Sequence, residues 1–322
     1  MTFAQIIGHE SQKQVLRRAL ESDRLAHAYL FEGPEGVGKG LMALALVRAL
    51  FCLQGNGCGN CTACRKVDHF NHPDLHTLEP DGQFIKIEQV RAIQKELAYR
   101  PLEAKYRICI IEGADRLHPG AGNALLKTLE EPPAGTLFIL LSAKPEMVLR
   151  TIRSRCQRLP FGRLPQELLE QLLETKLQVE SSHSHVLAAL SDGSLKKALG
   201  RDRELYLQER ITLLKSLTAL SSGSLLPLFE LAETLADDKE RLPDILDILQ
   251  GFYRDLLLLL LGRPQNELVN IDLLEKIQRT AARETTASIL PKLEAIVSCR
   301  RALERNVNKQ LAMDVLLMRL VA

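Results

Sequence analysis

The stretch Gly33-Pro34-Glu35-Gly36-Val37-Gly38-Lys39-Gly40 follows a short apolar run, Ala28–Phe31, and precedes a segment rich in Leu, Ala and Val. It fits the pattern G-x-x-x-x-G-K-[ST] at every fixed position except the last. A loop of this kind leaves a strand, surrounds phosphate with backbone N–H groups, and leads into a helix whose N-terminus favours anions. The sequence therefore predicts a P-loop fold, with the helix at Leu41–Leu53.

The last position of this motif lacks the hydroxyl group that would hold Mg²⁺, because Gly40 stands where Ser or Thr is expected. Lys39 keeps the cation that pairs with β- and γ-phosphates. The sequence does not determine whether a nucleotide occupies the loop, or whether that nucleotide would be ATP or ADP. The candidate nucleotide-binding residues of the loop are Gly33, Gly36, Gly38, Lys39 and Gly40.

The composition narrows the class of protein. A chain of 322 residues predicts about two or three domains. Its net charge of +2 and aromatic content of 4% give no argument for a nucleic-acid partner or a base-stacking surface. The N-terminus shows no secretory leader, and the longest apolar run, Leu256–Leu261, is too short to cross a bilayer, so a cytoplasmic location is expected.

Strands and helices alternate through the first half of the chain. Unbroken apolar runs at 107–111 and 136–141 predict strands buried on both faces, and 157–161 predicts an edge strand. Helices are expected before 25, at 85–97 and at 121–130, the last ended by Pro132-Pro133, and 52–64 and the His72 region are expected to be irregular. This alternation predicts an α/β domain with a parallel sheet.

The second half of the chain is expected to be helical throughout. A small bundle is predicted at 166–199, followed by longer helices that break at 221–223, at 262–264 and at Pro291. The leucine run is expected to be a helix buried on nearly all sides. The predicted domains are a P-loop domain at 1–162 with a cysteine module at 52–64, a small helical domain at 163–203, and an all-α domain at 204–322.

A second position indicates that the chain does not hydrolyse ATP. The predicted strand at 107–111 leads into Glu112, which suits the metal side of the site, but Gly113 stands where a catalytic glutamate would activate water. Asp115 is interpreted as a helix N-cap. Together with Gly40, the chain therefore lacks two side chains that hydrolysis needs, one to bind Mg²⁺ and one to activate water. Little or no intrinsic ATPase activity is expected.

Four cysteines in a short stretch predict a structural metal site. Cys58, Cys61 and Cys64 follow one another at two-residue gaps, and Cys52 lies just upstream. Four thiolates suit a closed tetrahedral Zn²⁺ site. An iron–sulfur motif would need a fourth cysteine where Asp68 stands, so zinc is preferred, with His69 and His72 as alternative fourth ligands.

Arg155, in Ser154-Arg155-Cys156, is the candidate catalytic residue. An arginine on a turn at a domain edge can neutralise charge on the γ-phosphate of a neighbouring subunit. The tripeptide alone favours a surface arginine that is solvated or paired with Asp or Glu.

Three stretches together resemble AAA+ subunits of the bacterial DNA polymerase III clamp loader. They are the P-loop after His27–Phe31, the run Asn123-Ala124-Leu125-Leu126-Lys127-Thr128-Leu129-Glu130-Glu131-Pro132-Pro133, and Thr151–Cys156. The resemblance is dense over the first half of the chain. Gly40 and Gly113 make it closer to the loader's non-hydrolysing member than to its ATP-hydrolysing gamma/tau member.

The resemblance implies a stator in a hetero-pentamer with gamma/tau-type and delta-type subunits, which loads a sliding clamp on primed DNA. It implies that Arg155 acts in trans on the ATP site of a neighbour, that 163–203 is a lid, that 204–322 is a collar, and that the cysteines hold zinc. Lys196 stands where the family's second sensor has arginine, and Ser142 falls near the first sensor. The alternatives are an ATP-hydrolysing motor subunit and a zinc-dependent DNA-binding adaptor.

Overall fold

The structure is a computed structural model that describes residues 2–200, 203–220, 225–237, 241–305 and 307–321. The chain divides into two compact units. The first consists of Met1–Leu168 with Gly193–Lys197, and the second of Leu169–Asp192 with Ala198–Ala322. Each unit has a hydrophobic core of its own.

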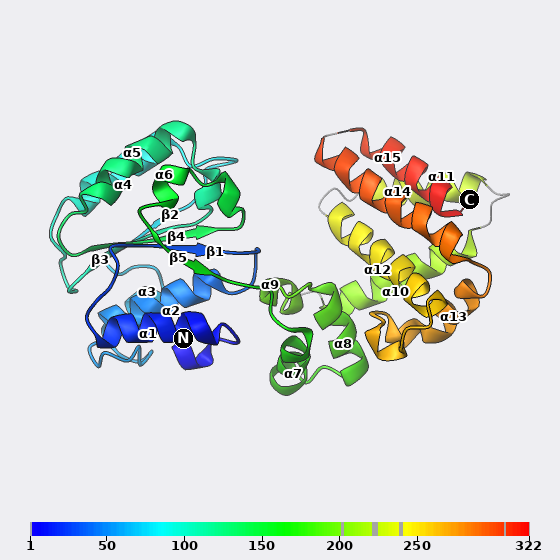
Figure 1. The fold of residues 1–322 in the computed structure, drawn as a ribbon, viewed down its shortest axis with the longest axis horizontal. Coiled ribbons are helices and arrows are strands. Elements are labelled where there is room, and N and C mark those ends of the chain that lie inside the picture. The colour runs from blue at the N-terminus through cyan, green and yellow to red at the C-terminus, as the bar shows by residue number, and fades with distance from the viewer. Residues whose placement is uncertain (1, 201–202, 221–224, 238–240, 306, 322) are drawn as a thin grey trace. The chain divides into compact units, whose positions relative to one another are not determined.

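The first unit is built on a parallel sheet of five strands in the order β2-β3-β4-β1-β5 (Figure 1). In the register of the sheet, Ala28 lies opposite Phe138 and Tyr29 lies opposite Gln157. The three central strands are buried along their whole length, as the unbroken apolar runs predict. The strands are β1 (Ala28–Glu32), β2 (Leu75–Leu78), β3 (Arg107–Ile111), β4 (Thr136–Ser142) and β5 (Gln157–Pro160).

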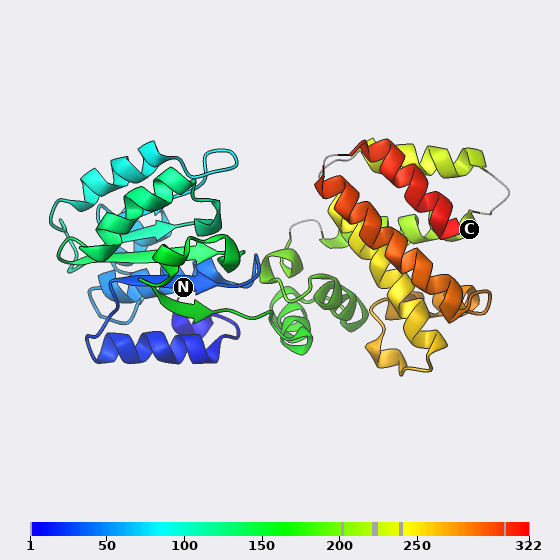
Figure 2. The ribbon, with the colours of Figure 1, turned by 45° about the horizontal axis from the view of Figure 1, so that its top comes forward.

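Helices cover both faces of this sheet (Figures 1 and 2). Alternate residues of β1 point to opposite faces: Phe31 packs in one core cluster and Leu30 in another. One face carries α1 (Glu10–Glu21), α2 (Lys39–Phe51) and α3 (Thr62–Asp68), and the other carries α4 (Ile87–Leu97), α5 (Pro119–Glu130) and α6 (Arg150–Arg153). Short 3₁₀ turns are η1 (Phe3–Gln5), η2 (Ala114–Arg116) and η3 (Pro145–Met147). The parallel α/β domain is therefore confirmed.

The rest of the described chain is helical, also as predicted. Phe252 and Leu256 of α12 form one core with Ile296 of α14 and Leu317 of α15. The elements are α7 (Gln166–Leu177), α8 (Ser181–Leu190), α9 (Leu195–Ala198), α10 (Arg203–Ala219), α11 (Leu225–Asp237), α12 (Leu242–Leu260), η4 (Gln265–Glu267), η5 (Ile271–Leu273), α13 (Leu274–Ala281), α14 (Thr286–Glu304) and α15 (Lys309–Val321). None of the helices described is long and apolar enough to cross a membrane.

The predicted break at Pro291 is wrong, because α14 continues through it. A proline lacks the N–H that would bond the carbonyl oxygen of Ala287. Both residues are exposed, so water can solvate that oxygen. The break at 262–264 agrees with the end of α12 at Leu260, and the one at 221–223 lies outside the described residues.

Two short elements and the leucine run also differ from the prediction. Neither β2 nor α3 was predicted, because β2 has only four residues and α3 only seven, and both lie close to Gly, Asn, His or Pro. In the leucine run, Leu256 is buried, but residues 257–260 are half-buried and Leu261 is exposed. The run therefore forms the end of an amphipathic helix rather than a helix buried on nearly all sides.

Candidate functional site

The P-loop joins the carboxyl end of β1 to α2, with Gly38 as the N-cap of the helix. The ammonium group of Lys39 is buried and donates hydrogen bonds to the backbone oxygens of Gly33 and Pro34, both at 2.6 Å. Burial lowers the pKa of Lys39, against the opposing charges of Glu35 and Asp115. The lysine that would meet phosphate is therefore held on the carbonyl groups of its own loop.

A distant segment, Gly193–Lys197, packs on this loop and belongs to the same unit. The backbone N–H of Lys196 donates to the carbonyl oxygen of Gly36 at 3.1 Å, and its ammonium lies 3.2 Å from the Glu35 carboxylate. Gly36 has φ +79°, and a Cβ there would lie 2.1 Å from Oγ of Ser194. The structure thus brings Lys196 to the P-loop, and only glycine fits at position 36.

At position 40, unlike position 36, the packing does not require a glycine. A Cβ at this position would meet only Cδ1 of Leu141, at 3.9 Å. The hydroxyl group missing from the motif is therefore a chemical loss that the packing does not impose.

The ends of β3 and β4 meet beside the P-loop strand. Gly113 has φ +64°, and a Cβ there would lie 3.2 Å from Nε of Arg116. Partial burial and the nearby Glu79 charge raise the pKa of Glu112. The left-handed backbone at Gly113 makes any side chain, a catalytic glutamate included, strained at this position.

Asp115 is not a helix N-cap, so that interpretation is wrong. Its carboxylate accepts hydrogen bonds from the hydroxyl of Ser142 at 2.8 Å and from the N–H of Ala143 at 3.0 Å. It joins the segment after β3 to the end of β4. Ser142, the residue near the first sensor position, is completely buried in this contact.

Arg155 lies on the turn between α6 and β5, with 35% of its side chain exposed. Its Nη2 is 2.6 Å from a carboxylate oxygen of Glu130, and its Nη1 donates to the carbonyl oxygen of Thr151 at 3.0 Å. Sequence reasoning missed this partner, although Glu130 lies within the run that carries the family resemblance. Cys156, the next residue, is buried in the core behind the turn.

The four cysteines of the module converge, as predicted. The sulfur atoms of Cys52, Cys58, Cys61 and Cys64 all lie within 4.8 Å of one another. Tetrahedral Zn²⁺ with bonds of about 2.3 Å would place its sulfurs about 3.8 Å apart. The sulfur arrangement therefore fits one zinc ion after small adjustments.

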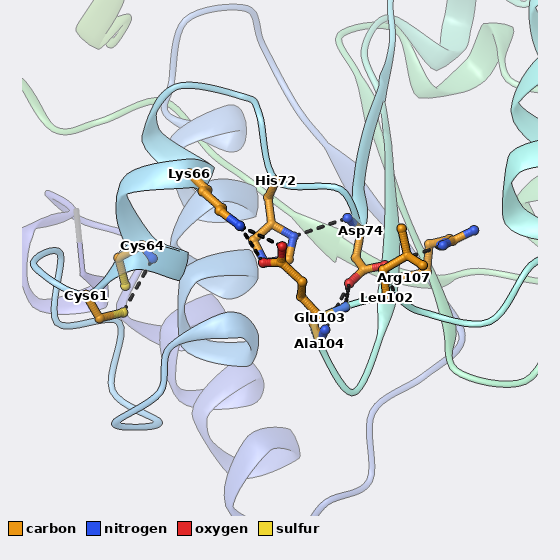
Figure 3. Close-up of polar contacts among 9 residues, drawn as sticks. All are labelled: Cys61, Cys64, Lys66, His72, Asp74, Leu102, Glu103, Ala104 and Arg107. Carbon is orange, nitrogen blue, oxygen red and sulfur yellow. Dashed lines mark hydrogen bonds and ion pairs between the residues drawn. The ribbon is translucent and has the colours of Figure 1, made fainter.

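Backbone N–H groups point at two of these sulfurs. The backbone N–H of Cys58 donates to the sulfur of Cys52 at 3.3 Å. The backbone N–H of Cys64 donates to the sulfur of Cys61 at 3.4 Å, and Figure 3 shows this second bond. Burial opposes ionisation of Cys52, but such N–H groups outweigh it and lower its pKa to about 6. They also lower the pKa of Cys61. The loop thus favours the thiolate, which is the form that binds metal, at Cys52 and Cys61. Burial has the opposite effect on Cys64 and raises its pKa to about 12.

The two histidines proposed as alternative ligands lie outside the sulfur cluster. His72 is buried, stacks on Phe51 with 4.2 Å between ring centroids, and accepts the N–H of Asp74 at Nδ1 (Figure 3). His69 is exposed at the end of α3. The group of residues that could hold a metal in the described chain is formed by cysteines alone.

Comparison with known proteins gives consistent matches over most of the chain. The profile of the family described as DNA polymerase III, delta subunit, matches residues 8–165, and that of its C-terminal region matches residues 204–321. DNA polymerase III subunit delta' of Bacillus subtilis is 34% identical over 314 residues, which cover 95% of this chain and 94% of that protein.

Similarity to gamma/tau proteins is partial. DNA polymerase III subunit gamma/tau of Mycobacterium bovis is 37% identical over 176 residues, covering 53% of this chain and 30% of that protein. Among solved structures, a gamma subunit-related protein from Thermotoga maritima has a TM-score of 0.47 at 21% identity, covering 95% of this chain and 97% of that one.

Proposed function

The chain belongs to the delta' family of DNA polymerase III clamp-loader subunits, and from that premise we propose that it is the loader's non-hydrolysing stator. It helps to load the sliding clamp on primed DNA by lending Arg155 in trans to the ATP site of a neighbouring gamma/tau-type subunit. The observation that carries the proposal is the contrast between a partly exposed Arg155 on an edge turn and a nucleotide site that lacks two groups needed for hydrolysis, one at Gly40 and one at Gly113.

The proposed absence of ATPase activity rests on chemistry at two positions. Gly40 offers no oxygen to Mg²⁺, and Gly113 offers no base to the attacking water. The Lys39 ammonium is already bonded to two carbonyl oxygens, so phosphate would have to displace them. If ATP or ADP binds, the residues concerned are Gly33, Gly36, Gly38, Lys39, Gly40, Glu112 and Lys196, and the nucleotide stays uncleaved.

The proposed role of Arg155 rests on the properties of guanidinium. It is permanently charged and presents a planar fork that suits phosphate oxygens. Arginine fingers supplied by a partner accelerate phosphoryl transfer by about 10³- to 10⁵-fold in other systems. The arginine here lies on a short turn at the sheet edge, which suits contact with a neighbour.

The proposed partners follow from the family. They are gamma/tau-type and delta-type subunits in a hetero-pentamer, with the sliding clamp and primed DNA reached through the complex. We assign 1–162 to the P-loop domain, 163–203 to the lid and 204–322 to the collar that joins the other subunits. Zn²⁺ would be held by Cys52, Cys58, Cys61 and Cys64 and would stabilise the module without entering the chemistry.

Reconstitution tests the proposal. The gamma/tau-type and delta-type subunits of the same organism are assembled with this chain, and DNA- and clamp-stimulated ATPase activity is measured with the wild type, with Arg155→Ala and without the chain. Arg155→Ala should assemble normally but lower the stimulated rate about tenfold or more. Arg150→Ala, at an exposed arginine of α6, the short helix just before the turn that carries Arg155, is the control. Unchanged ATPase in Arg155→Ala removes the role in trans.

An ATP-hydrolysing motor subunit of the same loader is the second candidate. It is favoured by the retained Lys39 and by the 37% identity to a gamma/tau protein. ATP turnover by the isolated chain at a rate typical of AAA+ motors would support this candidate over the stator.

A further inference from the structure

The Arg155 guanidinium connects two elements of the first unit. Through Nη2 it contacts the Glu130 carboxylate at 2.6 Å, and through Nη1 it donates to Thr151 O at 3.0 Å and to Ser154 Oγ at 3.2 Å. These contacts use three of the five N–H donors that an arginine carries. The side chain is thus held in one orientation while donors remain for another group.

Glu130 lies on the more firmly fixed of these elements. It is the last residue of α5, which ends before Pro132-Pro133. The preceding residue, Leu129, is buried in one core cluster with Ile152 of α6. The side-chain amide of Gln94 on α4 also donates to Ala124 O at 2.8 Å and to Thr128 Oγ1 at 2.7 Å, so α5 is anchored along its length.

The stability of the fold does not explain a glutamate at this position. A carboxylate at a helix C-terminus faces the negative end of the helix dipole, which is unfavourable. The pair is also half exposed, with 35% of the Arg155 and 47% of the Glu130 side chain open to solvent. Exposed ion pairs stabilise a fold little. The consequence of this contact is the restricted orientation of the arginine.

We propose that Glu130 is a positioning residue for Arg155, an inference that rests on the proposed function of Arg155 in trans. The carboxylate on the anchored end of α5 holds the guanidinium at the subunit edge before the neighbour's phosphate arrives. Without it, a side chain with four rotatable bonds must be ordered during each turnover. Removing the carboxylate should therefore lower the stimulated ATPase rate about three- to tenfold, which is less than removing the arginine.

The test uses the reconstituted loader with Glu130→Gln, Arg155→Ala and the double variant. Glu130→Gln should lower kcat about three- to tenfold with the KM for ATP unchanged. The double variant should be no slower than Arg155→Ala, because Glu130 acts only through Arg155. Glu131→Gln, which removes the adjacent exposed carboxylate, is the matched control and should behave as wild type. Glu130→Ala, which also removes the carboxylate, replaces Glu130→Gln if that variant does not fold.

The outcomes separate this inference from the function on which it rests. If Arg155→Ala is slow but Glu130→Gln is as fast as wild type, or the two losses multiply, Glu130 does not position Arg155 and the inference alone is overturned. If Arg155→Ala is as fast as wild type, the role in trans is overturned and the inference with it. The melting temperature of the isolated Glu130→Gln chain should change by no more than about 2 °C, and a large drop would indicate a structural role instead.

Discussion

The Asp74 carboxylate and the Arg107 guanidinium face each other 3.5 Å apart inside the first unit, and both side chains are almost completely buried (Figure 3). Asp74 lies just before β2, and Arg107 is the first residue of β3. The same carboxylate accepts the backbone N–H groups of Leu102, Glu103 and Ala104 at 2.7 to 2.9 Å. One buried charge therefore shapes the loop that leads into β3.

Asp74→Asn should destabilise the fold by about 2–4 kcal/mol, because an amide cannot serve three N–H donors and a buried cation equally well. The free energy of unfolding, measured in urea, checks this. Asp81→Asn, which alters an exposed pair with Lys86, should change the free energy of unfolding much less, because exposed ion pairs are screened by water and salt. Equal effects of the two variants would contradict the importance of the buried pair.

The acid dependence of stability should change with the same residue. Burial opposes ionisation of Asp74, but the three N–H groups and Arg107 outweigh it, so its pKa lies below the ordinary 3.8. A lowered pKa means that the unfolded chain binds the proton more readily, so this contribution is complete at neutral pH and is lost as the pH falls below about 4. Thermal melts of Asp74→Asn between pH 7 and pH 3 should fall less steeply than those of the wild type.

Two glycine substitutions in the P-loop should act in opposite directions. Gly36→Ala places a Cβ against Ser194 at a left-handed φ, and should destabilise the first unit by about 1–3 kcal/mol. Gly40→Ala makes only an ordinary contact with Cδ1 of Leu141 at 3.9 Å within α2, and should stabilise by about 0.5–1 kcal/mol. Differential scanning calorimetry compares the two. A stabilising Gly36→Ala would show that Gly193–Lys197 does not pack tightly on the loop.

Restoring the lost chemical groups should not restore hydrolysis. Gly40→Thr adds the missing hydroxyl where space allows it, but Gly113→Glu forces a side chain onto a left-handed backbone next to Arg116. Phosphate release by the double variant in isolation should stay at the wild-type level. A rate approaching that of AAA+ motors would show that these two positions alone separate this chain from a motor.

Metal analysis should find one Zn²⁺ per chain in protein purified without a histidine tag. Cys61→Ser should lose the metal and lower the melting temperature, since a structural zinc stabilises the module that binds it. Cys109→Ala, at a buried cysteine of β3 outside the cluster, should also lose stability but keep one Zn²⁺. Full zinc content in Cys61→Ser would exclude the four-sulfur site.

The sequence predicted the elements whose signals are local. The P-loop, the continuous apolar strands and the cysteine spacing are each read from a short stretch of sequence. The loop and the strands were confirmed in the fold, and so was the convergence of the four cysteines. Short elements were missed, because β2 is only four residues long and depends on pairing with β3. The break predicted at Pro291 was wrong for a related reason. A proline is a local signal, but whether it ends a helix depends on whether the carbonyl oxygen four residues earlier, which loses its N–H donor, is exposed to water.

The contacts of the site residues could not be predicted from the sequence. Nothing in the spacing between Glu130 and Arg155 indicates that they meet, and Asp115 looks like a cap until β4 is placed beside it. Lys196 was assigned to the nucleotide site by resemblance, while its N–H bond to Gly36 depends on a chain reversal about 160 residues later. Such pairs follow from topology, which periodicity does not encode.

The packing of Gly193–Lys197 on the P-loop has a consequence for biosynthesis. The first unit is not a continuous piece of chain, since its last five residues are translated only after the helices at 169–192. When a nascent chain has emerged from the ribosome only up to the end of β5, the segment that packs on Gly36 has not yet been made, so Gly36 is still exposed. Completion of the first unit must wait until Lys197 has emerged, by which point residues 169–192 of the second unit have also been translated.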